Sequence, residues 1–171
     1  AASPVLTVKE LGFAWPGSQL RVEISRLDVS PNEHWLLEGP SGSGKSTLLQ
    51  LLGGVLLPQR GDVSILGQRW ATLSAAQRDI RRADHVGFIF QQFNLVPYLS
   101  ALENTLLPCR FSPARRLAAE SGGGLKDEAR RLLAALGLGA KEIQLRRAAR
   151  LSVGQQQRVA AARALIGRPA L

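Results

Sequence analysis

The segment GPSGSGKST, residues 39–47, has a residue pattern suited to binding phosphate, Gly-x4-Gly-Lys-Ser/Thr. Its glycines allow the backbone to curl, so that several N–H groups can point at phosphate oxygens. Lys45 adds a point charge for β- and γ-phosphates, and the hydroxyl of Ser46 is placed to ligate Mg²⁺. The alternative is a glycine-rich turn that binds nothing. The pattern predicts a triphosphatase or kinase loop with contacts from Gly39, Ser41, Gly42, Ser43, Gly44, Lys45, Ser46 and Thr47.

A second candidate anion site lies at LSVGQ, residues 151–155. Ser152 and Gln155 have the spacing of a capping box, in which two side chains satisfy backbone donors at a helix N-terminus. Gly154 lies inside that first turn. Because helix N-termini attract anions, the segment is suited to a second phosphate contact. An ordinary capped helix without a ligand would have the same pattern.

Alternating and apolar runs predict the elements that must position these two segments. HWLLE reads as a buried parallel strand because it is a short apolar run that ends at a glycine. We expect strands in VLTVKELGFAW (5–15), LRVEISRLDV (20–29), HWLLE (34–38), GDVSILG (61–67) and HVGFIF (85–90), with a turn at Pro16-Gly17. We expect helices in KSTLLQLLGGV (45–55), ended by Gly53-Gly54, and in SAAQRDIRRA (74–83).

Helices dominate the prediction after residue 92. Ser100 and Glu103 have capping-box spacing, which indicates a helix start at SALENTLL. SGGG, residues 121–124, is predicted to be a flexible loop. KDEARRLLAALGLG (126–139) has acids in its first turn and Gly137 past its end, as an amphipathic helix would. The sequence therefore predicts an α/β core that carries a mainly helical insertion.

The stretch LSVGQQQRVAAARAL, residues 151–165, resembles the signature motif of ABC-type ATPases, the nucleotide-binding subunits of ABC transporters. GPSGSGKST resembles the Walker A loop of this family. Trp15 in LGFAWPG falls where the family places an aromatic that stacks on adenine. Gln91 in GFIFQQFNLVPYLSALENTLLP resembles the Q-loop glutamine. The motifs follow the family's order, and FNLVPYLSALENTLLP is most similar to the lipoprotein-release, macrolide-export and glycolipid-export branch.

This resemblance implies an α/β P-loop NTPase core (RecA-like), an N-terminal antiparallel β region and a helical subdomain. It implies one domain over residues 1–171, with an ATP-binding core (1–92), the helical subdomain (93–150) and the signature helix leading back to the core (151–171). It assigns catalytic roles to Lys45, Gln91 and Ser152, metal ligation to Ser46 and Gln91, and further ATP contacts to Trp15, Gly154 and Gln155.

The resemblance also implies partners and a cellular location. Two such subunits, here expected to be a homodimer, pair head to tail so that each ATP-Mg²⁺ lies between one phosphate loop and the other signature. A membrane permease would dock near the Q-loop, which places the chain in the cytoplasm on the inner face of the cell membrane. The apolar contact surface would come from Phe93, Leu95, Pro97, Tyr98 and Leu99, unless these residues form internal core.

Charge and cysteine content narrow the remaining function classes. The net charge is +9 and the pI is about 11.2, which invites a nucleic-acid interpretation. However, the arginines are scattered over helical stretches without interleaved aromatic side chains, so dedicated nucleic-acid binding is not expected. A basic face near anionic lipid headgroups is an alternative. The single cysteine, Cys109, is expected to be structural.

The sequence departs from the family pattern in two places. Val153 occupies the first signature glycine position, and we expect it to be tolerated because Ser152, Gly154 and Gln155 remain. In the family an apolar strand ending in Asp-Glu follows, whereas this sequence stops at GRPAL, residues 167–171. On its own the stretch is expected to hold nucleotide weakly, to be unstable and not to hydrolyse ATP. The alternatives are a non-catalytic nucleotide-binding module and a non-transport ABC ATPase. A small P-loop kinase would have no use for LSVGQQQR.

Overall fold

A computed structural model describes residues 3–171, which form two compact units. The first unit runs as far as Arg82 and also contains Leu171, and the second comprises Ala83–Ala170. The boundary at residue 92 expected from the family resemblance concerns function rather than packing, and it stays a prediction.

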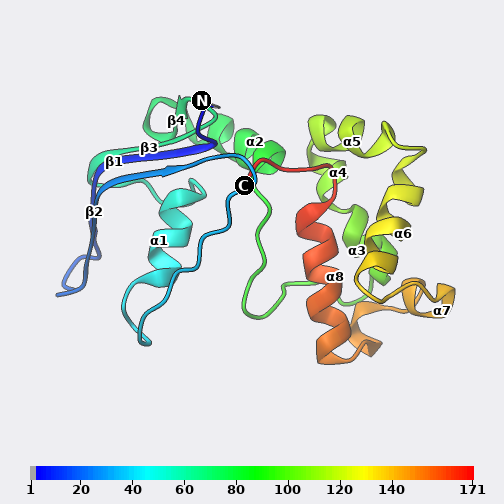
Figure 1. The fold of residues 1–171 in the computed structure, drawn as a ribbon. Coiled ribbons are helices and arrows are strands. Elements are labelled where there is room, and N and C mark those ends of the chain that lie inside the picture. The colour runs from blue at the N-terminus through cyan, green and yellow to red at the C-terminus, as the bar shows by residue number, and fades with distance from the viewer. Residues whose placement is uncertain (1–2) are drawn as a thin grey trace. The chain divides into compact units, whose positions relative to one another are not determined.

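An antiparallel sheet forms the main layer of the first unit (Figure 1). Its strands lie in the order β2-β1-β3-β4, with bounds Leu6–Ala14 (β1), Arg21–Val29 (β2), Arg60–Ile65 (β3) and Gln68–Arg69 (β4). Leu6 of the central strand faces Val29 on one side and Ile65 on the other, and all three are buried. This arrangement confirms the predicted N-terminal strands and their antiparallel pairing.

The helices of the first unit are anchored by a buried tryptophan. Helix α1 (Lys45–Leu52) follows the glycine-rich loop and buries Leu48 and Leu51. Trp70, in the 3₁₀ helix η1 (Trp70–Thr72), is 0% exposed, and its indole N–H donates to the carbonyl of Leu52 at 3.0 Å. Helix α2 (Ala75–His85) begins in this unit, and its Arg82 donates to the Gly54 carbonyl at 3.1 Å. These two contacts fix the C-terminal end of α1.

Two predicted strands do not form, and this part of the prediction is wrong. Residues 34–38 have no strand structure, and Trp35 and Leu36 are 64% and 81% exposed rather than buried. His85 ends α2, and residues 86–90 follow without strand structure. A strand is stabilised by ladder hydrogen bonds to its neighbours. Within residues 3–171 neither segment pairs with another strand, so apolar composition alone does not make them strands.

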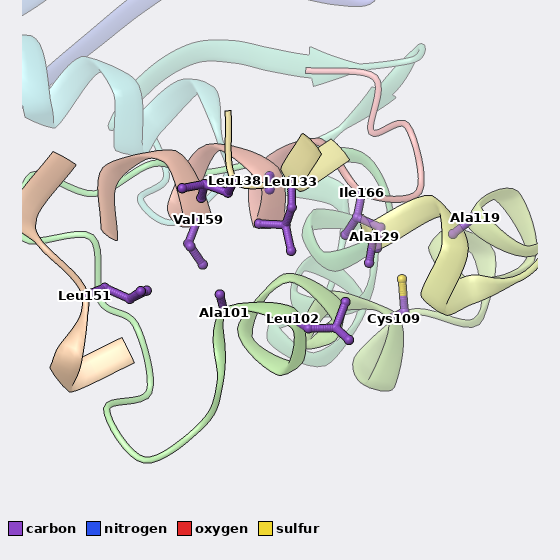
Figure 2. Packing of buried hydrophobic residues seen from close by; sticks show 11 residues of the cluster. Ala101, Leu102, Cys109, Ala119, Ala129, Leu133, Leu138, Leu151, Val159 and Ile166 are labelled. Atoms are coloured by element: carbon purple, nitrogen blue, oxygen red, sulfur yellow. The ribbon is translucent and has the colours of Figure 1, made fainter. Parts of the chain in front are cut away.

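The second unit is helical, and α8 packs against α3 and α6 (Figure 1). The elements are α3 (Ala101–Leu106), α4 (Pro108–Phe111), α5 (Pro113–Glu120), α6 (Leu125–Ala135), α7 (Lys141–Gln144), η2 (Ala148–Arg150) and α8 (Val153–Leu165). Figure 2 shows their shared apolar core, made of Ala101, Leu102, Cys109, Ala119, Ala129, Leu133, Leu138, Leu151, Val159, Ala162 and Ile166. Cys109 belongs to this core, as expected for a structural thiol, and burial raises its pKa.

Local capping sets where the helices of this unit begin. Both predicted capping boxes are present, Ser100 with Glu103 and Ser152 with Gln155. The backbone N–H and the hydroxyl of Ser100 each donate to the Glu103 carboxylate at 2.8 Å, which lowers the pKa of Glu103. The SGGG segment is a turn and loop between α5 and α6, as predicted. Among residues 3–171, no helix is long and apolar enough to cross a membrane.

Candidate functional site

The glycine-rich loop leads directly into α1, as its sequence pattern predicts. Gly42 has φ 80° and Gly44, the N-cap of α1, has φ 91°, both in the left-handed region. A side chain is strained in that conformation, and a Cβ on Gly44 would also lie 3.0 Å from Val22 of β2. The loop therefore needs glycine at position 44 both for its backbone conformation and for its approach to the sheet.

The Lys45 side chain folds back onto this loop and donates hydrogen bonds to it. Its ammonium group donates to the carbonyls of Gly39 at 2.6 Å and Pro40 at 2.7 Å. Among the described residues no carboxylate forms an ion pair with it. An open cavity of about 440 Å³ borders the loop, which is within the size range of ligand sites. A cation held by neutral groups, the two carbonyls and the Ser43 hydroxyl at 3.5 Å, beside such a cavity fits an anionic ligand.

An aromatic ring contacts the first turn of α1, the helix that follows the loop. The indole N–H of Trp15 donates to the Thr47 hydroxyl at 3.2 Å, and its ring makes an edge-to-face contact with Phe13 at 5.2 Å. Trp15 is 44% exposed, so its ring is accessible. Of the sequence-predicted residues, the structure thus brings Trp15 into contact with Thr47, which follows the loop at 39–46 in the same unit.

Gln59 holds the backbone just before that ring, and no sequence pattern indicates this role. Its side-chain carbonyl accepts from the Ala14 N–H at 3.0 Å, and its amide donates to the Ala14 carbonyl at 2.9 Å. The two residues are 45 positions apart. A single glutamine before a strand has no local pattern, so only the folded chain reveals this contact.

The predicted signature residues lie at the N-terminus of α8, in the second unit. Ser152 is the N-cap, and its hydroxyl accepts from the Gln155 N–H at 3.3 Å. Val153 is 71% exposed, and a Cβ at Gly154 would meet no atom within 4 Å. Gln156, which the pattern did not single out, donates to the carbonyls of Ala148 and Leu151 at 3.2 and 3.1 Å. The first turn of α8 is therefore capped by Ser152 and held to the preceding segment by Gln156, whereas Val153 and Gly154 are exposed.

Gln91 lies in the second unit, in an exposed turn before two residues of unusual conformation. Phe93 and Asn94 have φ 58° and 47°, which is uncommon for residues other than glycine. The guanidinium of Arg163 in α8 donates to the carbonyls of Asn94 at 2.7 Å and Phe93 at 2.5 Å. Burial lowers the pKa of Arg163. Sequence reasoning missed Arg163 because about 70 residues separate the partners.

The proposed apolar contact surface is divided between exterior and core. Tyr98 is 72% exposed and Pro97 is exposed, whereas Leu95 packs against the core cluster. Phe93 and Leu99 are half-buried. Only Pro97 and Tyr98 are thus fully available to another molecule, and the core alternative describes Leu95 better.

The chain thus has a glycine-rich loop with a lysine in its first unit and a capped, exposed helix start in its second unit. The ABC transporter family matches residues 22–171. The chain belongs to the ABC transporter family. The match includes the glycine-rich loop, the turn at Gln91 and the start of α8.

Relatives within this family come from export and lipoprotein-release systems. The chain is 40% identical to the lipoprotein-releasing system ATP-binding protein LolD 2 of Rhodospirillum rubrum, over 98% of this chain and 71% of that protein. It is 42% identical to the macrolide export ATP-binding/permease protein MacB of Syntrophobacter fumaroxidans, over 85% of this chain. It spans 71% of the length of LolD 2 and only 19% of that of MacB. These relatives agree with the branch expected from the sequence.

Solved structures support the same fold. The chain superimposes on a dimeric bacterial ABC transporter cassette with a TM-score of 0.75 and 34% identity, over 96% of this chain and 70% of that one. A post-hydrolysis dimer of an ATP-binding cassette bound to ADP and phosphate gives a TM-score of 0.73 at 32% identity, over the same shares of the two chains. The expected fold class, an ABC-type P-loop NTPase with an antiparallel β region and a helical subdomain, is therefore confirmed.

Proposed function

We propose that this chain is the ATP-binding part of an ABC transporter, in which ATP binding and hydrolysis drive movement of a substrate through a membrane permease. The observation that carries the proposal is the loop at 39–47, where Lys45 has no acidic partner among residues 3–171 and donates to backbone carbonyls. Membership of the ABC transporter family agrees with it.

The loop residues and Trp15 each have a defined role in this proposal. The Lys45 ammonium leaves the Gly39 and Pro40 carbonyls and binds the β- and γ-phosphates, since a phosphate is a stronger acceptor for a cation. The left-handed glycines keep backbone donors directed at the phosphates. Trp15 stacks on adenine, with its ring oriented by the Thr47 hydroxyl. ATP is thus held at its base and at its triphosphate.

Magnesium would neutralise charge on the phosphates and orient the γ-phosphate for transfer to water. The residues suited to hold it are Ser46, an exposed residue in the first turn of α1, and Gln91, whose amide oxygen is a hard ligand. Both assignments come from the family resemblance, and both fit in chemical type.

The signature residues serve a second copy of the chain. Ser152 and Gly154 begin α8, where backbone donors and the helix dipole favour an anion. In a head-to-tail pair they would contact the γ-phosphate bound by the other subunit, and Gln155 would hold the cap closed. The related dimeric cassettes make such pairing the natural expectation. A permease partner on the Pro97–Tyr98 side and a position on the inner face of the cell membrane complete the proposal.

The direct test is calorimetric titration of the chain with ATP, AMP and inorganic tripolyphosphate, with and without Mg²⁺. We expect saturable binding of ATP that is strengthened by Mg²⁺, weaker binding of tripolyphosphate, and still weaker binding of AMP. This order follows because both the loop and Trp15 contribute to ATP, whereas AMP lacks the phosphates that Lys45 binds. AMP binding as tight as ATP binding would argue against a triphosphate site.

Gln59→Ala should weaken ATP binding about 3- to 10-fold, because two hydrogen bonds of roughly 0.5–1 kcal/mol each fix Ala14 beside the adenine platform. Tripolyphosphate affinity should stay unchanged, since that ligand does not use Trp15. Gln68→Ala is the matched control, because Gln68 lies in the edge strand β4 and its amide donates to the hydroxyl of nearby Thr72. An equal loss for ATP and tripolyphosphate would show that Gln59 acts on the whole fold instead.

A further inference from the structure

The turn after Gln91 is held by an arginine from the signature helix. We propose that Arg163 is a positioning residue that makes the Gln91 segment move together with α8, and so couples the proposed metal ligand to Ser152 and Gly154. The inference rests on the proposed function, because only there do Gln91 and the signature residues act on nucleotide. Its structural part, the hold on Phe93 and Asn94, can be tested without nucleotide.

The first support is the conformation of the turn. Phe93 and Asn94 are two successive left-handed residues, a state that costs roughly 1 kcal/mol or more for a residue with a large side chain. Two short local bonds also hold it, from the Phe93 N–H to the Phe90 carbonyl and from the Asn94 N–H to the Gln92 carbonyl. A turn of this kind persists when its surroundings stabilise it.

The second support is the geometry of Arg163. Its two terminal nitrogens reach two successive carbonyls, at 2.7 and 2.5 Å, which matches the planar fork of a guanidinium. Among the described residues no carboxylate pairs with it, although it is partly buried. The carbonyls of Phe93 and Asn94 are therefore its main compensation for the loss of water.

The third support is that Arg163 and the signature residues lie in one helix whose C-terminal end is fixed. Arg163 lies in the same helix as the signature, about 16 Å along its axis from Ser152 at 1.5 Å per residue. The buried Arg115 of α5 donates to the carbonyls of Ile166 at 2.8 Å and Ala164 at 2.5 Å, which fixes the end of α8. Movement of α8 must carry the turn with it or break the two bonds of Arg163.

Asn104 holds the other side of the turn. Its amide is 0% exposed, accepts from the Val96 N–H at 2.8 Å and donates to the Val96 carbonyl at 3.0 Å. The segment is thus fixed to α3 at Val96 and to α8 at Phe93–Asn94. Gln91 lies two residues before Phe93, just outside these anchors.

The test is amide hydrogen exchange of the 171-residue chain, compared with Arg163→Lys. Lysine keeps the charge but has a single nitrogen, which cannot reproduce the fork. We expect exchange in residues 91–96 to rise about 10-fold, with exchange in α6 unchanged. Arg158→Lys is the matched control, since Arg158 is exposed on the same helix and donates to the Gly154 carbonyl within that helix. Unchanged exchange in Arg163→Lys would overturn the inference and leave the proposed function untouched.

Asn94→Val tests the same contact by changing the turn instead of the arginine. A β-branched side chain disfavours the left-handed conformation, and Asn94 is exposed, so the core is not disturbed. The same local rise in exchange is expected, which keeps the test valid should Arg163→Lys loosen the whole unit. Protection of residues 91–96 equal to that of the unsubstituted chain would contradict the hold by Arg163.

Magnesium dependence of ATP affinity separates positioning from mere stability. Arg163→Lys should reduce the strengthening of ATP binding by Mg²⁺ several-fold, as Gln91→Ala should, and leave Mg²⁺-free affinity unchanged. A full Mg²⁺ effect in Arg163→Lys beside a reduced one in Gln91→Ala would overturn the coupling alone. A full effect in both variants would refute the metal role of Gln91 and the coupling together.

Discussion

Lys45→Ala should lower the affinity of the chain for ATP by about 10- to 100-fold. A hydrogen bond to a charged group contributes about 1.5–3 kcal/mol, and 1.4 kcal/mol corresponds to a factor of ten. Lys45 is the cation of the loop, and its present acceptors are neutral carbonyls that a phosphate can replace. The measurement is a titration with a fluorescent ATP analogue, followed by competition with unlabelled ATP.

Two controls make this result specific. AMP affinity should change little, because AMP has no β- or γ-phosphate for Lys45 to bind. Lys9→Ala removes the same charge from an exposed position of β1 and should leave ATP affinity within about twofold, as expected for a screened surface charge. If Lys9→Ala weakened ATP binding as much as Lys45→Ala, net charge rather than the loop would explain the binding.

Trp70→Ala should destabilise the first unit by about 3–5 kcal/mol, the usual cost of removing a large buried aromatic side chain. The indole is fully buried and holds the C-terminal end of α1 through the Leu52 carbonyl. Because the phosphate loop leads directly into α1, ATP binding should be lost when the first unit unfolds. Urea unfolding monitored by the fluorescence of Trp15 and Trp35, which both lie in the first unit, measures the change in the free energy of unfolding.

Trp70→Phe keeps most of the ring and removes the N–H donor. It should cost about 1–3 kcal/mol, because the Leu52 carbonyl loses its partner and a smaller void remains. Helix content of the second unit, followed by circular dichroism, should be little affected by either substitution, since its core cluster lies wholly in residues 101–166. Trp70→Ala with an unchanged urea midpoint would contradict the anchoring role of Trp70.

Short-range features of this protein could be predicted from the sequence because their causes are local. The glycine loop and the helix after it depend on residues within one segment, and so do the capping boxes at Ser100 and Ser152, whose partners are three positions away. The hairpin of β1 and β2 follows from alternating side chains around a short turn. The same locality carried the resemblance to ABC-type ATPases.

Contacts between distant segments were decided only by the tertiary structure. The wrong strand predictions at 34–38 and 85–90 have this origin, because an apolar run becomes a strand only when another strand lies beside it. Gln59 reaches Ala14 across 45 positions and Arg163 reaches Asn94 across 69. No periodicity marks such residues, since their partners are backbone groups that every residue has. The sequence by itself indicated the groups that we propose to bind ATP, and the tertiary structure decided which side chains hold those groups in place.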